Sequence, residues 1–278
     1  MTVLNNRVAL ITGASRGIGR ACAETLAAHG AAVVVNFLNS QDAATEVVTG
    51  ITARGGQAIA VRADVSDRDD VVAMMDVVRE QFGRLDIIVS NAAAGGFRPL
   101  LQATPASFDS ILRMNTAPLI WLVQAGLELM QLDSRAKQRT SEPTTPVRHA
   151  SAGQHVNGTQ RKVIAISSHG SFRGIANYGA IGASKAALES LVRHFALELG
   201  RSGLTFNAVM PGIVETDAIR TLPGAVGMLE SVQEQILIRN RMLQPQDVAD
   251  TVAFLAGPHS DLIQGQVIVV DGGISIRV

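Results

Sequence analysis

Short apolar runs rich in valine and isoleucine alternate along the chain with longer segments of helical periodicity. The apolar runs occupy residues 8–11, 33–35, 59–61, 87–89, 163–166, 205–209 and 267–270. The helical segments place apolar residues three and four positions apart and occupy residues 17–29, 41–54, 68–82, 107–131, 184–200 and 246–256. Apolar strands that alternate with helices are typical of a parallel sheet covered on both faces. The pattern predicts a single-domain α/β Rossmann fold over residues 1–278, with a doubly wound parallel sheet of about seven strands.

Residues 132–162 interrupt this alternation. They lack hydrophobic periodicity and contain Pro143, Pro146 and six bases, two of which are Arg161 and Lys162. Such a segment offers too little apolar surface to offset the entropy of ordering it. The sequence therefore predicts a flexible surface insertion at 132–162.

Composition and charge narrow the function classes. The 24 basic and 24 acidic side chains cancel, which removes any global electrostatic case for binding nucleic acid or an anionic membrane. No run approaches the roughly 20 apolar residues of a membrane span. The single cysteine, Cys22, stands among alanines and leucines, so we expect it to pack inside a helix. We expect a soluble cytoplasmic protein and no metal site.

A glycine-rich loop follows the first apolar run, and a helical segment begins within it. The loop reads TGASRGIG at 12–19, and its candidate cofactor-binding residues are Gly13, Ser15, Arg16, Gly17, Ile18 and Gly19. Glycines at these positions allow a tight turn, backbone approach to a pyrophosphate and close helix–strand packing. A strand before the loop and a helix after it make a nicotinamide dinucleotide the expected ligand.

The choice between NADPH and NADH depends on the end of the second strand. An acidic residue there would bind the adenosine ribose and repel a 2′-phosphate, but the chain has Asn36 followed by Phe37 and Leu38. Arg16 can reach the same region and pair with a phosphate. We therefore expect NADPH rather than NADH.

Two further strand ends should line the cofactor crevice. Asp64 and Val65 follow the third strand, and Asn91, Ala92 and Ala93 follow the fourth. We expect them to flank adenine and ribose. For Asp64, a role as the cap of the helix near residue 68 is an equal alternative.

Several motifs occur together in an order that identifies a family. They are TGASRGIG at 12–19, NAAAGG at 91–96, Asn115, ISS at 166–168, Tyr178 with Lys185, PGIVET at 211–216 and DGG at 271–273. Together they resemble the short-chain dehydrogenases/reductases over the whole chain apart from the insertion. Ordinary members have three residues between the tyrosine and the lysine, whereas here six residues lie between Tyr178 and Lys185. Ile181 stands at the usual tyrosine position, four residues before the lysine. This spacing is similar to the divergent enoyl-acyl-carrier-protein reductases, type III most closely.

The resemblance implies a role for each site residue. Tyr178 would donate its hydroxyl to the oxyanion, Lys185 would bind the nicotinamide ribose, Ser168 would assist at the carbonyl, and Asn115 would support a water chain behind the lysine. Residues at the nicotinamide carboxamide would be Pro211, Gly212, Ile213, Val214 and Thr216. The resemblance also implies a substrate lid at about residues 215–240, where glycines can serve as hinges. Candidate substrate contacts are Gly95, Phe97, Tyr178 and Met228.

The implied reaction is NADPH-dependent reduction of the 2,3 double bond of a trans-2-enoyl thioester. Its partner would be an acidic acyl carrier protein, which requires a basic rim from Arg98, Arg193 or the insertion. The alternatives are a ketone or 3-ketoacyl reductase, including one that tailors a secondary metabolite, and more remotely a non-catalytic NADP-binding regulator. Apolar residues on several faces of 186–199 and at the end of the chain suggest self-association, and the family implies a homotetramer.

Overall fold

The computed structural model describes residues 3–130, 160–216, 225–238 and 241–277. Seven parallel strands form one sheet in the order β3-β2-β1-β4-β5-β6-β7. The strands are β1 Val8–Ile11, β2 Ala32–Phe37, β3 Ala58–Arg62, β4 Ile87–Ser90, β5 Arg161–Ile166, β6 Leu204–Pro211 and β7 Val267–Val270. The change of direction in strand order between β1 and β4 is typical of a doubly wound sheet. The predicted fold class is therefore confirmed.

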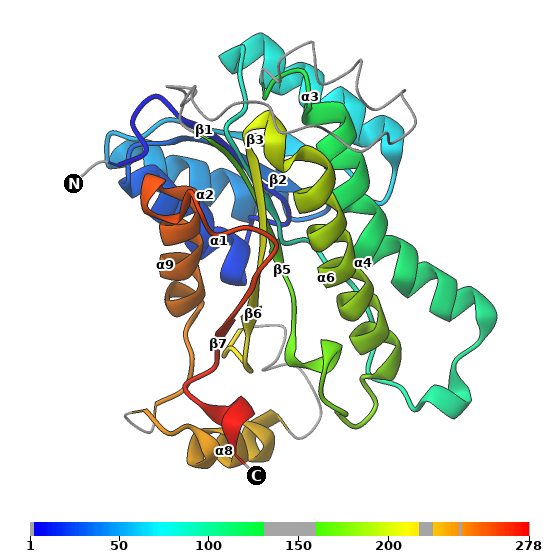
Figure 1. Cartoon of the computed structure of the whole chain (residues 1–278). Helices are drawn as coiled ribbons and strands as arrows, with labels where there is room; N and C mark the ends of the chain where they lie inside the picture. The colour runs from blue at the N-terminus through cyan, green and yellow to red at the C-terminus, as the bar shows by residue number, and fades with distance from the viewer. Residues whose placement is uncertain (1–2, 131–159, 217–224, 239–240, 278) are drawn as a thin grey trace, which may run out of the picture.

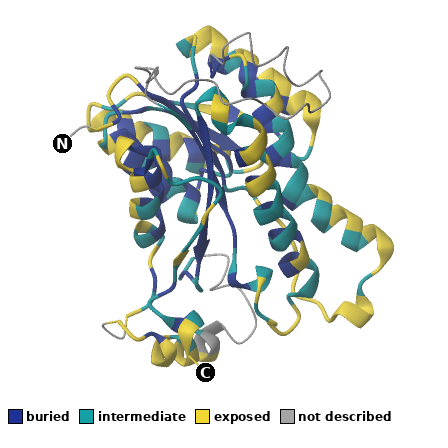
Figure 2. Ribbon diagram, viewed as in Figure 1, coloured by how far each residue is buried: buried dark blue, intermediate teal, exposed yellow. Residues whose placement is uncertain are grey.

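Helices cover both faces of the sheet (Figure 1). The helices are α1 Gly17–Ala28, α2 Gln41–Ala53, α3 Arg68–Phe82, α4 Pro105–Gly126, α6 Gly179–Leu199, α8 Ala225–Gln235 and α9 Pro245–Ala256. Short 3₁₀ turns are η1 Leu100–Gln102, η2 His169–Ser171, η3 Gly200–Ser202, η4 Pro258–Ser260 and η5 Ile274–Ile276. α1 packs against α9 on one face, and α4 packs against α6 on the other. Figure 2 shows the buried residues concentrated along the sheet between these layers.

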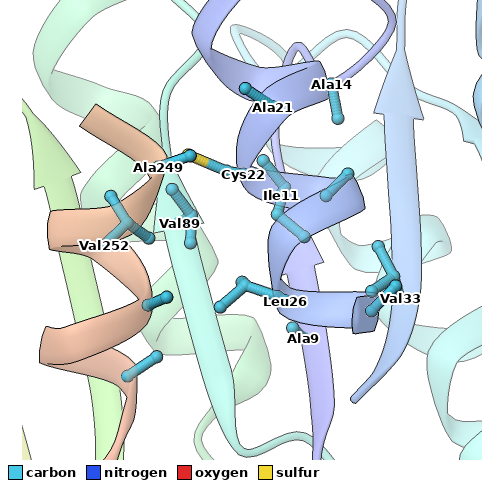
Figure 3. Packing of buried hydrophobic residues seen from close by; sticks show 14 of the residues in the cluster. Ala9, Ile11, Ala14, Ala21, Cys22, Leu26, Val33, Val89, Ala249 and Val252 are labelled. Atoms are coloured by element: carbon cyan, nitrogen blue, oxygen red, sulfur yellow. The ribbon is translucent and has the colours of Figure 1, made fainter. Parts of the chain in front are cut away.

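The core consists of two apolar clusters, one on each face of the sheet. Cys22 belongs to the cluster under α1 and α9, where it lies beside Ala249 (Figure 3). It is fully buried, and burial raises the pKa of its thiol to about 12. The expected packing role is confirmed, because a thiol that stays protonated and covered is an inert apolar group.

Differences from the predicted element boundaries include those of β5, α4 and α6. β5 begins at Arg161, so Arg161 and Lys162 belong to the sheet and not to the predicted insertion. Lys162 is 1% exposed and its Nζ lies 2.7 Å from Asp261 Oδ1. The partly exposed Asp261 carboxylate compensates the charge of the buried lysine, so a basic residue can stand at the start of a core strand. The rest of the insertion, 131–159, lies outside the described residues.

The other two differences concern long helices. α4 starts two residues early, because Thr104 and Ser107 form a capping box around Pro105, and it ends at Gly126. α6 starts at Gly179, five residues before the predicted start, although Gly179 and Gly182 weaken the helical pattern there. Gly182 is required by packing, since a Cβ on it would lie 2.4 Å from the carbonyl oxygen of Gly170.

The predicted lid region contains α8, and an isolated parallel bridge between Val214 and Leu243 joins the segments on either side of it. Residues 217–224 and 239–240 lie outside the described part of the chain. No helix among the described residues has the length and apolar character needed to cross a bilayer. Within the same residues, no group of His, Cys, Asp and Glu could hold a metal ion.

Candidate active site

Two clefts join at the carboxyl edge of the sheet. The first, of about 430 Å³, lies over the glycine loop and the ends of β2 and β3. The second, of about 480 Å³, lies over the ends of β5 and β6. Both are lined by Ile18, Asn91, Ala93 and Thr216, so they form one continuous groove. An open parallel sheet places its ligands at this edge, where the strand order reverses.

The glycine loop provides an anion-binding surface in the first cleft. Gly13 and Gly17 have φ of +62° and +56°, a region that favours glycine. No side chain caps the first turn of α1, so its backbone N–H groups are available to an anion. Gly19 lies underneath and does not line the groove, because a Cβ there would come within 2.4 Å of the Gly13 carbonyl oxygen. Its role is packing.

Asn36 stabilises the loop from the end of β2. Its side chain is buried, its Oδ1 accepts from the backbone N–H of Gly13 at 3.2 Å, and its Nδ2 donates to the Ala63 carbonyl at 3.1 Å. The amide of Asn36 therefore ties the glycine loop to the end of β3, at the position where an acidic residue would repel a 2′-phosphate. Arg16 lines the same cleft, beside Asn39 and Ser40.

The ends of β3 and β4 lie where the sequence predicts. Asp64, Val65, Asn91, Ala92 and Ala93 all line the first cleft. The alternative helix-capping role of Asp64 is wrong, because Asp67 caps α3 and accepts from the backbone N–H of Asp69 at 2.8 Å. Asp64 instead accepts from the backbone N–H of Ser66.

Tyr178 and Ser168 meet in the second cleft. Tyr178 stands at the N-cap of α6, and its hydroxyl donates to Ser168 Oγ at 3.1 Å. Burial raises the pKa of Tyr178, although the hydrogen bond to Ser168 opposes this effect, so the phenol stays protonated at neutral pH. The ring is confined by Gly170, where a Cβ would lie 2.3 Å from Tyr178 Cδ1, and by Phe97, whose ring centroid is 5.3 Å away.

Lys185 lies two turns further along α6 and also lines the second cleft. Its Nζ donates to the carbonyl of Ile166 at 2.8 Å. Burial lowers the pKa of Lys185 to about 8, while the more distant charge of Glu189 opposes that change. The lysine is still mainly cationic at neutral pH, and ribose hydroxyls would supply the oxygen partners that a buried ammonium requires.

Ile181, at the usual tyrosine position, does not face the cleft. It is 7% exposed and packs against Gly95, where a Cβ would lie 2.6 Å from Ile181 Cγ1. Gly95 therefore makes room for Ile181 and does not line either part of the groove. Of the predicted substrate contacts, Phe97 and Tyr178 do line the second cleft. The side chain of Met228 lies outside the described residues.

Asn115 connects the loop after β4 to α6. It is 4% exposed, its Oδ1 accepts from the backbone N–H of Ala94, and its Nδ2 donates to Ser184 Oγ, each at 2.9 Å. Ser184 precedes Lys185, so Asn115 holds the lysine turn against the cofactor loop. The expected water chain behind Lys185 stays a prediction.

The segment after β6, predicted to bind the nicotinamide carboxamide, forms one end of the second cleft. Pro211, Gly212, Ile213, Val214 and Thr216 all line the second cleft, as the sequence predicts. Gly212 is fixed by a bond from its N–H to the Val270 carbonyl at 2.9 Å. It also packs on Asp271, where a Cβ would find Asp271 Cβ at 3.0 Å.

A polar contact that the sequence pattern does not predict joins His169, the neighbour of Ser168, to the C-terminal segment. His169 Nε2 lies 3.0 Å from Asp271 Oδ2, and burial lowers the pKa of His169 despite the attraction of that carboxylate. Arg173 donates to the carbonyl of Ile274 at 3.1 Å. η5 and α8 lie together at this end of the molecule, and Leu237 donates its N–H to the Gly272 carbonyl at 2.8 Å (Figure 1). The only sequence signal was an acid before two glycines near the chain end.

Comparison with known proteins decides the family. The model described as short chain dehydrogenase matches residues 7–139, and the model described as Enoyl-(Acyl carrier protein) reductase matches residues 143–275. A 1-cyclohexenylcarbonyl-CoA reductase of Streptomyces collinus is 38% identical over 99% of this chain and 89% of its own length. The chain belongs to the short-chain dehydrogenase/reductase family. This membership makes it an oxidoreductase.

Other short-chain dehydrogenases/reductases are similarly related. A versicolorin reductase of Emericella nidulans is 35% identical over 97% of this chain and 96% of its own. A Burkholderia cenocepacia short chain dehydrogenase in complex with NADP superimposes with a TM-score of 0.82 at 32% identity, covering 98% of this chain and 99% of its own. A 7α-hydroxysteroid dehydrogenase complexed with NADH gives 0.83 at 31% identity, with 98% and 95% coverage.

Proposed function

We propose that this protein reduces the 2,3 double bond of a trans-2-enoyl thioester with NADPH. The observation that carries the proposal is the position of the phenol. Tyr178 reaches Ser168 in the cleft from the N-cap of α6, while Ile181 is buried against Gly95. The relative from Streptomyces collinus supports the same reaction class, since its name describes a carbonyl thioester conjugated to a ring double bond.

When bound, NADPH would provide the hydride that C3 of the enoyl group accepts, and solvent water would provide the proton that C2 accepts. Negative charge then develops on the thioester oxygen, where Tyr178 donates its hydroxyl. The raised pKa of Tyr178 suits a group that must remain a hydrogen-bond donor. Ser168 Oγ, 3.1 Å from that hydroxyl, orients it and donates a second hydrogen bond. The positive charge of Lys185 also stabilises the negative charge that develops on the thioester oxygen.

The residues of the first cleft fit NADPH. The uncapped N-terminus of α1 suits a pyrophosphate, Asn36 replaces the acid that would repel a 2′-phosphate, and Arg16 provides a cation beside it. One solved relative holds NADP and another NADH, so the preference of this chain follows from its own residues. The test is Arg16→Ala: KM for NADPH should rise about tenfold or more, with little change for NADH. Equal effects on both cofactors would contradict the assignment.

The carrier of the thioester is a separate question. One family model is described by the acyl carrier protein, whereas the Streptomyces collinus relative is named for coenzyme A. We propose acyl carrier protein as the physiological partner. Arg98 and Arg193 do not line the groove, whereas Arg173 does. Comparing kcat/KM for one enoyl group on each carrier tests this, and a preference for coenzyme A would overturn it.

The decisive experiment measures NADPH oxidation with a trans-2-enoyl thioester and, in parallel, the 3-ketoacyl thioester of the same length. We expect turnover of the enoyl substrate, lost in Tyr178→Phe. Turnover of the keto substrate alone would refute the proposal. It would favour the second candidate, a ketone reductase, to which the versicolorin reductase lends support. Tight NADPH binding without turnover of either would indicate the non-catalytic regulator.

We also propose a homotetramer. Leu197 on α6 is 81% exposed and Ile276 in η5 is 76% exposed, and both are large apolar groups that association would cover. Light scattering after size exclusion should give four times the mass of one chain, and a monomeric mass would rule the tetramer out.

A further inference from the structure

A second opening adjoins the catalytic cleft at Tyr178. It encloses about 600 Å³ between η1 and the turn that precedes α6. Its lining consists of Pro99, Leu100, Leu101, Gly170, Arg173, Gly174, Ile175, Ala176, Asn177, Tyr178 and Gly179. Tyr178, Arg173, Gly174 and Ile175 also line the catalytic cleft. We call this opening the side cleft; it is continuous with the site where the thioester carbonyl would bind.

The side cleft presents apolar side chains that the described chain leaves uncovered. Leu101 is fully exposed, Leu100 is 59% exposed and Ile175 is 38% exposed. Among its lining residues only Arg173 carries a charge, and that guanidinium already donates to the carbonyl of Ile274. Exposed residues predominate in the loop and turn at the start of α4 and α6 (Figure 2). A cleft of this character binds hydrocarbon better than a polar or charged group.

The walls of the side cleft are held in place by the fold. Arg98 donates its backbone N–H to the Asn177 carbonyl at 2.7 Å, which joins the two loops. Gly179 lies directly under Leu100, since a Cβ on it would be 2.6 Å from Leu100 Cγ. The ring of Tyr178 is fixed between Gly170 and Phe97. The surface is therefore preformed, which lowers the entropic cost of binding.

We propose that the side cleft binds the hydrocarbon part of the acyl group, beyond the carbons that react. The inference rests on the proposed enoyl thioester function and names the part of the site that would select acyl length. With the thioester oxygen at the Tyr178 hydroxyl, an acyl chain that continues along the tyrosine ring reaches Leu100 and Leu101. The lid side of the catalytic cleft, at Val232 and Gln235, lies on a different wall.

The test compares chain-length profiles. Burial of each methylene should raise kcat/KM about fourfold until the cleft is filled. We would measure trans-2-butenoyl, hexenoyl, octenoyl and decenoyl coenzyme A with NADPH. Leu101→Ser removes apolar wall, and Ala176→Trp fills the opening from an exposed position. Each should lower the ratio of octenoyl to butenoyl kcat/KM by about tenfold, which corresponds to about two methylenes.

The matched control is Leu262→Ser, because Leu262 is 96% exposed and lines neither cleft. It should leave the ratio as in the unaltered protein. Equal losses for all chain lengths in the two cleft variants, or no losses, would overturn the proposal. So would a lower oligomer mass for Leu101→Ser with an unchanged profile, since the cleft would then be covered by a second copy of the chain.

Failure of the proposed function is recognised separately. In that case the unaltered protein turns over no enoyl thioester of any length. Calorimetric titration of decanoyl and butanoyl coenzyme A into the NADP-loaded protein then tests the side cleft without chemistry. Tighter binding of decanoyl, reduced in Leu101→Ser but not in Leu262→Ser, supports the cleft. Equal affinity for the two ligands overturns it.

Discussion

Replacing Lys185 by methionine should abolish turnover and at the same time stabilise the cofactor-free protein. Lys185 is 5% exposed, and its Nζ has the Ile166 carbonyl as a hydrogen-bond acceptor at 2.8 Å. Among the described residues no carboxylate lies within ion-pair distance of it, and Glu189 acts only at longer range. Methionine has a similar length and no charge, so it can fill the same space.

The magnitude follows from the pKa of Lys185. Burial lowers it from 10.5 to about 8, a difference of about 2.5. At about 1.4 kcal/mol per pH unit, keeping the charged form buried costs about 3 kcal/mol. Loss of the hydrogen bond to Ile166 offsets about 1–2 kcal/mol of the gain. We therefore expect Lys185→Met to raise the free energy of unfolding by about 1–2 kcal/mol at neutral pH.

The pH dependence has a definite sign. Between pH about 8 and 10.5 the folded lysine loses its proton before the unfolded one does. The unfolded state then binds more protons, so the stability of the unaltered protein rises with pH in this window. The advantage of Lys185→Met should therefore shrink as the pH rises from about 8 towards 10.5.

Lys162→Met is the matched control. Lys162 is 1% exposed and burial lowers its pKa too, but the Asp261 carboxylate opposes that effect: Nζ of Lys162 contacts Asp261 Oδ1 at 2.7 Å and Ser260 Oγ at 3.2 Å. Removing it leaves a carboxylate and a buried hydroxyl without their donor, which should destabilise by about 1–3 kcal/mol. Urea unfolding without NADPH measures both, because bound cofactor would stabilise the folded state by mass action. If Lys185→Met destabilised as much as Lys162→Met, burial would not be the cause of the lowered pKa.

Three further predictions concern the same site. Tyr178→Phe should lower kcat by about 10²–10³ and leave KM for NADPH unchanged in steady-state kinetics, and a loss below tenfold would assign the donor role elsewhere. Gly170→Ala should lower kcat with unchanged circular dichroism, because its Cβ would displace the tyrosine ring from a distance of 2.3 Å; full activity would show that the ring is free to move. For Asp271, burial raises the pKa but hydrogen bonds from the following turn outweigh it and lower the pKa. Asp271→Asn should therefore lower Tm at neutral pH, with the difference shrinking as the pH falls through the carboxyl range, and a constant difference would contradict this.

The sequence predicts those parts of the fold that follow from local patterns. All seven strands are found, because strands buried on both faces are continuous apolar runs such as Val33 to Val35. The start of α6 is missed because Gly179 and Gly182 satisfy contacts with Leu100 and Gly170, which are close only in the folded chain. Local propensity opposes a helix there, and tertiary packing determines it.

The candidate site likewise contains residues that local sequence patterns place and contacts that only the folded chain creates. Residues that lie at strand ends, such as Asn91 and Ser168, can be placed from the sequence because parallel strands end at one edge. The contact between His169 and Asp271 cannot be predicted from the sequence, since it joins loops that are far apart in the chain. Gly95 was expected to contact substrate, but its small size serves Ile181. The sequence shows that a small residue is required at a glycine position, but it does not show whether a ligand or a neighbouring side chain occupies the space.

The position of Tyr178 at the N-cap of α6 is compatible with a hydroxyl that points into the same cleft as Lys185. Tyr178 at the N-cap and Lys185, seven residues or about two turns later, both line the second cleft, whereas Ile181 between them is buried against Gly95. The shift carries the phenol about 4.5 Å along the axis of α6 towards its N-terminus. A ketone has its oxygen on the carbon that accepts the hydride, whereas an enoyl thioester has its oxygen two atoms further away. Under the proposed function, the displaced hydroxyl of Tyr178 would therefore lie nearer the oxygen on which charge develops.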